Sequence, residues 1–194
     1  RAAATWALLM GGAKANVVFT SPPYASQRKY DESSGFKPVP PDDYVAWWEP
    51  LQACVREHLA ADGSFFVNIK AHAEDGQRHL YVFDLVVAHA RRWSWLFKDD
   101  LVWFKRSMPG EWPDRFRNDW EPVFHFTPSK VIKFRPMNVA HESDACRSYA
   151  PNEGRTFGGN IGIGDIGHVS GLARPGNVIE ISTRENPDGN AHSA

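Results

Sequence analysis

The segment Thr20-Ser21-Pro22-Pro23-Tyr24 holds the residues whose types and spacing are best suited to chemistry. Two consecutive prolines fix φ, remove two N–H donors and hold the preceding serine extended. The local backbone therefore offers mainly carbonyl acceptors, to which Ser21 adds a hydroxyl and Tyr24 adds a flat ring with a polar tip. Acceptors beside an aromatic plane suit a planar ring that carries an exocyclic amino group.

This arrangement predicts a reaction at an amino nitrogen. The amino nitrogen of cytosine is a poor nucleophile because its lone pair is delocalised into the ring. Hydrogen bonds from its two hydrogens to the Ser21 hydroxyl and to a proline carbonyl would localise that lone pair, so that a methyl sulfonium placed in line could be attacked directly. Positioning and preorganised dipoles would then supply the catalysis. A base in a duplex would have to leave the stack to reach this pocket.

Apolar runs and helical periods around the segment predict the elements that position it. Asp42 or Asp43 is expected to cap the first helix and Gly63 to end it, while Pro50 should kink this helix or mark a late start. Pro122 should confine its strand to a sheet edge or stand near the start of that strand. Strands are predicted over 16–20, 64–69, 101–104 and 121–126, and helices over 44–63 and 80–92.

The alternation of strands and helices predicts an α/β fold with a parallel sheet, which binds ligands at the carboxyl ends of its strands. Thr20 ends the first predicted strand, so the Ser-Pro-Pro-Tyr segment is expected at that edge of the sheet. Beyond Lys130 the periodicity dissolves into a glycine-rich region. We predict three parts: a catalytic half over 1–129, a loop-rich insert for target recognition over 130–176, and a lead-in to a cofactor-binding half over 177–194.

Composition limits the class of protein. The chain has 194 residues, of which 42% are hydrophobic and 23% are charged, with a net charge of -1. These values are typical of one globular domain and exclude a uniformly basic nucleic-acid-binding protein. No apolar run is long enough for a membrane span, no signal peptide is visible, and Cys54 and Cys146 have no paired spacing. A cytoplasmic protein is therefore expected.

Residues 20–24 resemble the catalytic motif of amino-methylating DNA methyltransferases, in the form typical of the cytosine-N4 branch. The similarity extends over nearly the whole chain, in the order of the subgroup whose catalytic motif precedes its cofactor motif. Its further segments are Tyr-Ala-Ser-Gln-Arg-Lys-Tyr at 24–30, the helix and strand over 44–69, Asp-Leu-Val-Trp-Phe-Lys at 100–105 followed by Pro109, Trp-Glu-Pro-Val-Phe-His-Phe at 120–126, and 177–183 through His192.

The resemblance implies a Rossmann-like sheet, incomplete in this chain, that binds S-adenosylmethionine and methylates cytosine N4 at a specific site in double-stranded DNA. It implies catalytic roles for Ser21, Pro22, Pro23 and Tyr24, and cofactor contacts for Thr20, Ser21 and His192. The Phe-x-Gly-x-Gly loop that cradles the cofactor is expected beyond Ala194, so this chain alone is expected to be inactive. Ser193 stands where the family usually has proline.

Two other functions stay open. Adenine-N6 methylation ranks second, because that branch usually has an acidic residue in place of Ser21. The other alternative is a non-catalytic DNA-binding or assembly module. A sheet that lacks the cofactor half would expose an edge and an apolar face, so self-association through that edge is expected.

Basic and aromatic residues interleave between residues 91 and 135. A solvated face is the default interpretation, and the alternative is an edge that contacts DNA phosphates. The candidates for such contacts are Arg28, Lys105, Arg106, Arg115 and Arg117.

Three remaining patterns carry weaker signals. Gly162 to Gly167 match G-x-G-x-x-G, but no clear strand precedes them and Gly171 and Pro175 disfavour a following helix, so a loop is predicted. The eight histidines show no ligand spacing, and no metal site is predicted. Trp47 and Trp48 are predicted to lie in the core.

Overall fold

The computed structural model describes residues 10–25, 37–105, 113–142 and 172–180. The chain divides into two compact units, one made of residues 1–133 and 177–194 and the other of residues 134–176. The target-recognition role expected for 130–176 stays a prediction. The glycine string at 162–167 lies outside the described residues.

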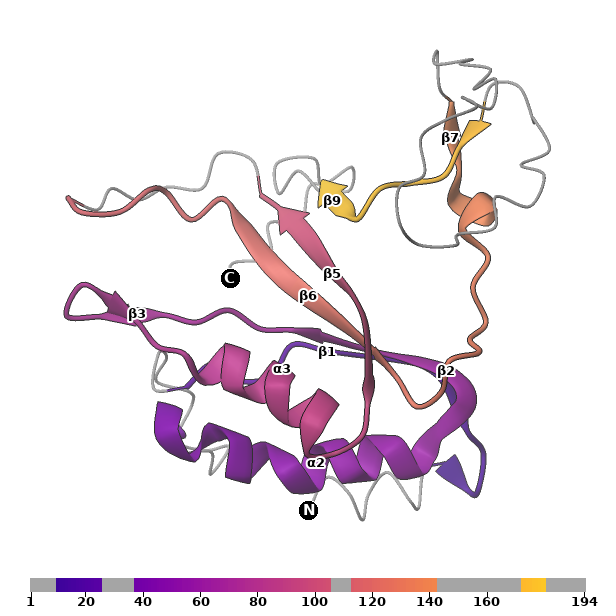
Figure 1. Ribbon diagram of the computed structural model, residues 1–194, viewed down its shortest axis with the longest axis horizontal. Coiled ribbons are helices and arrows are strands. Elements are labelled where there is room, and N and C mark those ends of the chain that lie inside the picture. Colours follow the sequence, from indigo (N-terminus) through magenta and orange to yellow (C-terminus); the bar gives the residue numbers. More distant parts are fainter. Residues whose placement is uncertain (1–9, 26–36, 106–112, 143–171, 181–194) are drawn as a thin grey trace, which may run out of the picture. The chain divides into compact units, whose positions relative to one another are not determined.

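The first unit contains a five-stranded sheet with the order β1-β2-β6-β5-β9 (Figure 1). β1 is parallel to β2, and β5 is parallel to β9, whereas β6 is antiparallel to both of its neighbours. The strands are β1 (Ala15–Thr20), β2 (Leu59–Asn68), β5 (Leu96–Phe104), β6 (Trp120–Thr127) and β9 (Val178–Glu180).

The α/β class is therefore confirmed, but the prediction of a wholly parallel sheet was wrong. A parallel neighbour requires a crossover, usually through a helix. Between β5 and β6 the described residues contain no helix, so β6 returns antiparallel to β5. This reversal brings the start of β6 to the edge where β5 ends.

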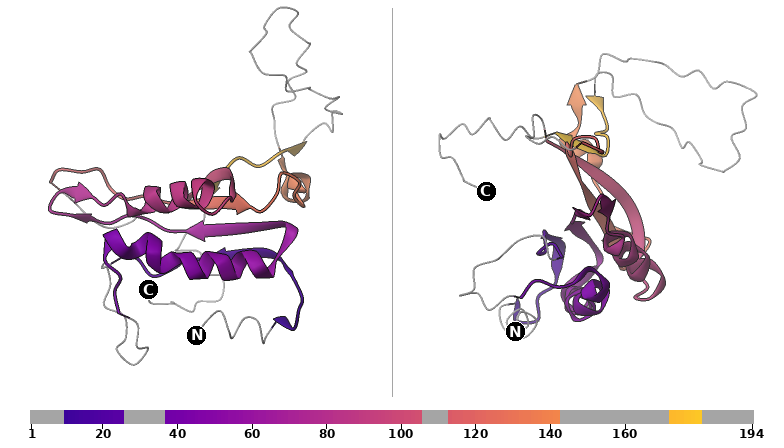
Figure 2. Two further views of the ribbon diagram at one scale, coloured as in Figure 1. Left: turned by 60° about the horizontal axis from the view of Figure 1, so that its bottom comes forward. Right: turned by 90° about the vertical axis from the view of Figure 1, so that its left-hand side faces the viewer.

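Two helices of the first unit lie side by side (Figure 1, Figure 2). They are α2 (Tyr44–His58), which follows the short 3₁₀ helix η2 (Pro41–Asp43), and α3 (Tyr81–Arg91). The fully buried Phe65 of β2 lies 6.4 Å from Trp48 of α2 and 6.1 Å from His89 of α3, measured between ring centroids. Both helices therefore cover the same face of β2, and an aromatic core fills the space between them.

The structure changes one predicted boundary and confirms others. α2 ends at His58, so Gly63 lies within β2 rather than at a helix end. A Cβ at Gly63 would stand 2.9 Å from the Asn16 carbonyl oxygen, so glycine is needed for the close approach of β1.

Asp43 is the N-cap residue of α2, without a side-chain cap, and the helix begins before Pro50 and continues through it. Pro122 lies near the start of β6, an interior strand.

Four very short strands were not predicted. β3 (Ala73–Glu74) and β4 (Gln77–Arg78) form a hairpin between β2 and α3. In the second unit, β7 (His141–Glu142) pairs with β8 (Leu172–Ala173), and η3 (Pro136–Val139) precedes them. Two-residue strands carry too little alternation to be recognised in a sequence. None of the described helices has both the length and the apolar character needed to span a membrane.

His89 is a fully buried polar residue in the aromatic core. Its Nε2 accepts a hydrogen bond from the Trp48 indole N–H at 3.1 Å, because the indole can only donate. Its Nδ1 then carries the hydrogen and donates it to the Leu85 carbonyl at 2.8 Å. Burial lowers the pKa of His89 from 6.5 to about 4. The neutral ring is thus fully satisfied, and a second proton would face the indole N–H.

We predict that acid destabilises the protein through His89. Because its folded-state pKa lies below the unfolded value, the unfolded chain binds an extra proton between pH 6.5 and 4, and stability falls as pH falls through this range. The loss attributable to this residue is on the order of 3 kcal/mol. Urea unfolding at several pH values measures it. His89→Gln should flatten the pH dependence of the unfolding free energy, whereas His141→Gln, at an exposed position, should retain it. Equal slopes in the wild type and His89→Gln would refute this role.

Candidate active site

Four strand ends meet at one edge of the sheet. Thr20 at the end of β1 pairs with Val67, near the end of β2. Asn68, the last residue of β2, pairs with Val123 near the start of β6. At the start of β6, Trp120 pairs with Phe104, the last residue of β5. The Ser-Pro-Pro-Tyr segment leaves the sheet at this edge, where the topology was expected to place a ligand.

Asn68 links the segment to the interior of the sheet. Its Oδ1 accepts a hydrogen bond from the Ser21 hydroxyl at 3.3 Å, and its amide nitrogen donates to the Pro122 carbonyl at 3.1 Å. Asn68 is buried, whereas Ser21 is exposed. Since the Ser21 hydrogen is directed at Asn68, the lone pairs of the Ser21 oxygen can accept hydrogen bonds from a ligand.

Tyr24 is held by a charged pair formed by Glu121 of β6 and Lys105, which directly follows β5. Its hydroxyl donates to Glu121 Oε2 at 3.2 Å, and the other oxygen of Glu121 accepts from Lys105 Nζ at 2.6 Å. The Lys105 ammonium also lies 4.0 Å from the centroid of the Trp103 ring. The side chains of Lys105 and Glu121 are only 14% and 18% exposed, so their pairing is largely removed from water.

The two prolines have different surroundings. The Pro23 carbonyl accepts a hydrogen bond at 2.7 Å from the hydroxyl of Tyr44, a fully buried residue at the start of α2. Pro22 is buried. α2 therefore anchors the segment at Pro23, and Asn68 contacts it at Ser21.

Lys70 and Trp120 line the same edge. The Lys70 ammonium donates to the Trp120 carbonyl and lies 5.6 Å from the centroid of the Trp120 ring. Burial lowers the pKa of Lys70 from 10.5 to about 8. Both residues also border a cavity of about 310 Å³ on the α3 side, with Val82, Phe83, Asp100 and Phe124 among its other walls.

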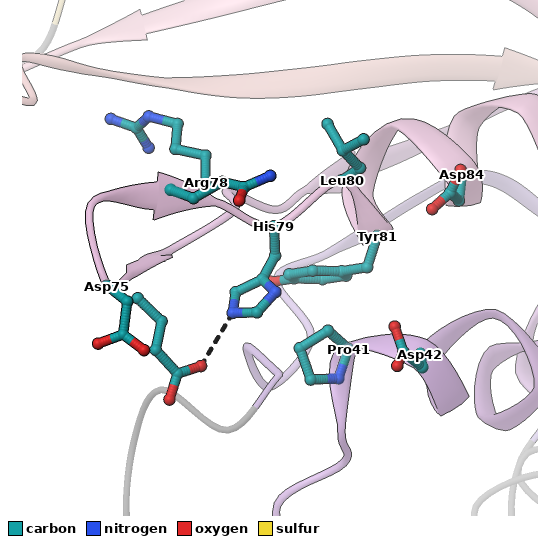
Figure 3. Close-up of a pocket in the computed structure, with 10 residues that line it drawn as sticks. Pro41, Asp42, Asp75, Arg78, His79, Leu80, Tyr81 and Asp84 are labelled. Carbon is teal, nitrogen blue, oxygen red and sulfur yellow. Dashed lines mark hydrogen bonds and ion pairs between the residues drawn. The ribbon is translucent and has the colours of Figure 1, made fainter.

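A second pocket, of about 510 Å³, lies at the β3–β4 hairpin. Figure 3 shows Pro41 and Asp42 from η2 on one side of it, and His79, Tyr81 and Asp84 from the hairpin and α3 on the other. No sequence pattern indicated this pocket, because its walls come from elements more than thirty residues apart.

The structure describes only some of the residues expected to bind DNA or cofactor. Thr20 is half-buried beside Ser21, and Arg117 is exposed. Arg115 lies 3.6 Å from the Asp114 carboxylate, and Lys105 is directed at Glu121 rather than outward. Arg28, Arg106 and His192 lie outside the described residues. The DNA and cofactor roles of this set stay predictions.

Asn68, Glu121 and Tyr44 were not predicted as site residues. Asn68 and Glu121 lie in segments that support the family resemblance, and each is a polar residue next to an apolar run near a predicted strand end. A polar residue at a predicted strand end was the signal by which Asn68 and Glu121 could have been found. Tyr44 begins a helix and carried no such signal.

Comparisons with known proteins identify the family. Residues 15–168 match the DNA methylase family of N6 and N4 methyltransferases, and the chain belongs to this family. It is 35% identical over 120 residues to the type II methyltransferase M.MwoI of Methanothermobacter wolfeii, covering 57% of this chain and 17% of that protein. It is 29% identical over 188 residues to M.PvuII of Proteus hauseri, covering 88% of this chain and 54% of that protein.

A solved structure shows the same fold. The PvuII DNA methyltransferase (cytosine-N4-specific) superposes with a TM-score of 0.57 at 21% identity, over 95% of this chain and 56% of that one. The expected methyltransferase fold and the family resemblance are thus confirmed. The chain spans about half the length, or less, of these relatives.

We predict that Glu121→Gln destabilises the protein by roughly 3 kcal/mol, because it leaves the Lys105 ammonium without its counter-charge in a largely buried position. Glu49→Gln is the matched control, since its partner Arg92 lies 2.8 Å away and both side chains are about half exposed. The control should cost less than about 1 kcal/mol. Urea denaturation of the two variants measures the difference, and equal small losses would show that the Glu121 pair contributes little.

Proposed function

We propose that this chain forms the base pocket of a DNA methyltransferase that modifies the exocyclic N4 of cytosine. The observation that carries the proposal is the hydrogen bond from Ser21 to Asn68. In this bond the Ser21 hydroxyl donates its hydrogen to Asn68, so that a lone pair of the Ser21 oxygen faces the exposed side of the motif. An amino group extruded from a duplex would find an acceptor there.

The chain's own residues would perform the positioning. The Ser21 oxygen accepts a hydrogen bond from one amino hydrogen. We assign the second acceptor to the Pro22 carbonyl, since the carbonyl of Pro23 already accepts the Tyr44 hydroxyl. Tyr24, steadied by Glu121, presents its ring for stacking on the base, an interaction worth about 1–3 kcal/mol. These contacts hold the nitrogen with its lone pair localised and pointed out of the ring plane.

S-adenosylmethionine fits the chemistry of this edge as the methyl donor. A sulfonium cation is favoured by oxygen acceptors and opposed by nearby cations. Both ammonium groups here, Lys70 and Lys105, are directed at protein oxygens. Thr20 and Ser21 would contact the cofactor, with His192 from outside the described residues. When bound, the cofactor supplies an electrophilic methyl group.

Cytosine is preferred to adenine for two reasons. A neutral serine stands where the adenine-N6 branch usually has an acidic residue. The solved structure that shares the fold is described as cytosine-N4-specific. The substrate would be double-stranded DNA, with phosphate contacts from Arg28, Arg106, Arg115 and Arg117, whereas Lys105 is held by Glu121. The protein would act in the cytoplasm.

Nucleoside analysis tests this function. The complete reading frame that contains this chain is expressed in a host without DNA methylation, and the host DNA is digested and examined by mass spectrometry. We expect N4-methylcytosine in the wild type and its loss in Ser21→Ala, which removes the acceptor oxygen. N6-methyladenine would establish the adenine alternative. DNA binding with no methylated base would establish a non-catalytic module.

We further propose that the isolated 194-residue chain self-associates through the β1 side of the sheet. β1 is an end strand in the described sheet, and its Val17 and Phe19 side chains are 60% and 62% exposed. An unpaired strand edge beside exposed apolar side chains is a surface that a second copy can cover.

Light scattering during size-exclusion chromatography tests this proposal. We expect the wild type to have a mass above that of a monomer, and Phe19→Glu to lower it toward the monomer. Phe83→Glu is the matched control, because Phe83 is 61% exposed but lies on α3. A monomeric wild type across the accessible concentrations would contradict self-association.

A further inference from the structure

The hairpin after β2 places three residues that can ligate a metal ion on one face. Asp75 and Gly76 at its turn have φ values of 49° and 78°, which is typical of the tight turns that join antiparallel strands. Glu74 pairs with Gln77, and the His79 N–H donates to the His72 carbonyl at 3.1 Å, so His72 lies opposite His79. Side chains alternate along a strand, which puts Glu74 on the same face as His72.

The three side chains converge. One potential ligand atom from each of His72, Glu74 and His79 lies within 4.8 Å of the other two. His79 Nε2 and Glu74 Oε2 are 3.0 Å apart, and the two imidazole centroids are 4.7 Å apart. Ligands around a tetrahedral zinc ion at about 2.0–2.2 Å lie about 3.4 Å from one another. Small side-chain rotations would therefore close the set around an ion.

An ordinary ion pair does not account for the whole cluster. The contact between His79 and Glu74 satisfies those two groups but leaves His72 outside it. His72 Nδ1 is buried and has no hydrogen-bond partner among the described residues. Burying a ring nitrogen without a hydrogen-bond partner lowers the stability of the fold. A metal ion bound to the His72 ring would change the surroundings of this nitrogen.

We propose that His72, Glu74 and His79 bind one divalent cation of the zinc class. Two imidazole nitrogens and one carboxylate oxygen favour zinc over magnesium or calcium, which prefer all-oxygen sites. Glu74 and His79 also line the pocket of about 510 Å³ shown in Figure 3. A fourth ligand, such as water, would reach the ion from this pocket.

The site would fasten the hairpin at the functional edge of the sheet. His72 follows closely on Lys70, which contacts Trp120, and His79 precedes α3. Arg78 of the same hairpin donates to the Ala71 carbonyl and to the Asn118 side chain. A bound ion would therefore limit movement of the segment between β2 and α3. Metal binding at this hairpin would not depend on the proposed methylation.

Cobalt and zinc titrations of the untagged, chelator-treated 194-residue chain test the proposal. Co²⁺ should give the visible absorption of a four-coordinate nitrogen–oxygen site with one ion per chain, and Zn²⁺ should displace it. His79→Ala should weaken binding about 100-fold or more, because losing even an outer-shell partner of a ligand costs about 10–100-fold. Glu74→Gln, at an exposed side chain, should weaken binding at least about 10-fold.

His141→Ala is the matched control, since it removes an exposed histidine outside the cluster, and should bind like the wild type. Circular dichroism establishes whether each variant is folded. If His79→Ala does not fold, Glu74→Gln still tests the proposal. A wild type that binds neither ion would overturn the proposal. So would equal affinities in the wild type and folded Glu74→Gln.

Discussion

The hydrogen bonds of Asn68 are the interactions on which the rest of the site depends. The buried Asn68 side chain accepts a hydrogen bond from the Ser21 hydroxyl and donates one to the Pro122 carbonyl. It therefore links the end of β2 to the segment that follows β1 and to the start of β6. An amide can do both at once because it carries an acceptor and a donor on adjacent atoms. The orientation of the Ser21 oxygen follows from this bond, and the proposed recognition of an amino group follows from that orientation.

The fold places Asn68 by burying large aromatic side chains nearby. Phe65 and Val67 of β2 are almost fully buried against the helices, which fixes the strand that ends at Asn68. The insertion of β6 between β2 and β5 then brings Pro122 to Asn68 and Glu121 to Tyr24. A wholly parallel sheet would have directed the start of β6 to the opposite edge, so the reversal is a requirement of this site.

Much of the fold could be predicted from local pattern. The apolar runs that end at Thr20 and near Asn68 are long enough to be recognised, as are the helical periods of α2 and α3. The antiparallel direction of β6 could not be predicted from periodicity, because alternation of side chains does not encode strand direction. The first half of β5 was missed because Lys98, Asp99 and Asp100 interrupt its apolar pattern.

The site was predictable where chemistry is concentrated in consecutive residues and unpredictable where it is assembled from distant ones. The residue types of Ser21 to Tyr24 alone predict a set of hydrogen-bond acceptors. The partners that orient them come from positions 44, 68 and 121, and only the fold brings these together. The histidine cluster is a further case, because His-x-Glu-x₄-His becomes a ligand set only when a tight hairpin places residue 72 opposite residue 79.

The most direct test of this account is a double-mutant cycle between Ser21 and Asn68, measured as methyl transfer by the complete enzyme. Ser21→Ala should lower turnover on the order of 100-fold, as the loss of one preorganised hydrogen bond does elsewhere. Asn68→Ala should also lower it, and the double variant should be no slower than Ser21→Ala, because Asn68 acts through the serine. Losses that multiply in the double variant would show that the two residues act independently and would contradict the account.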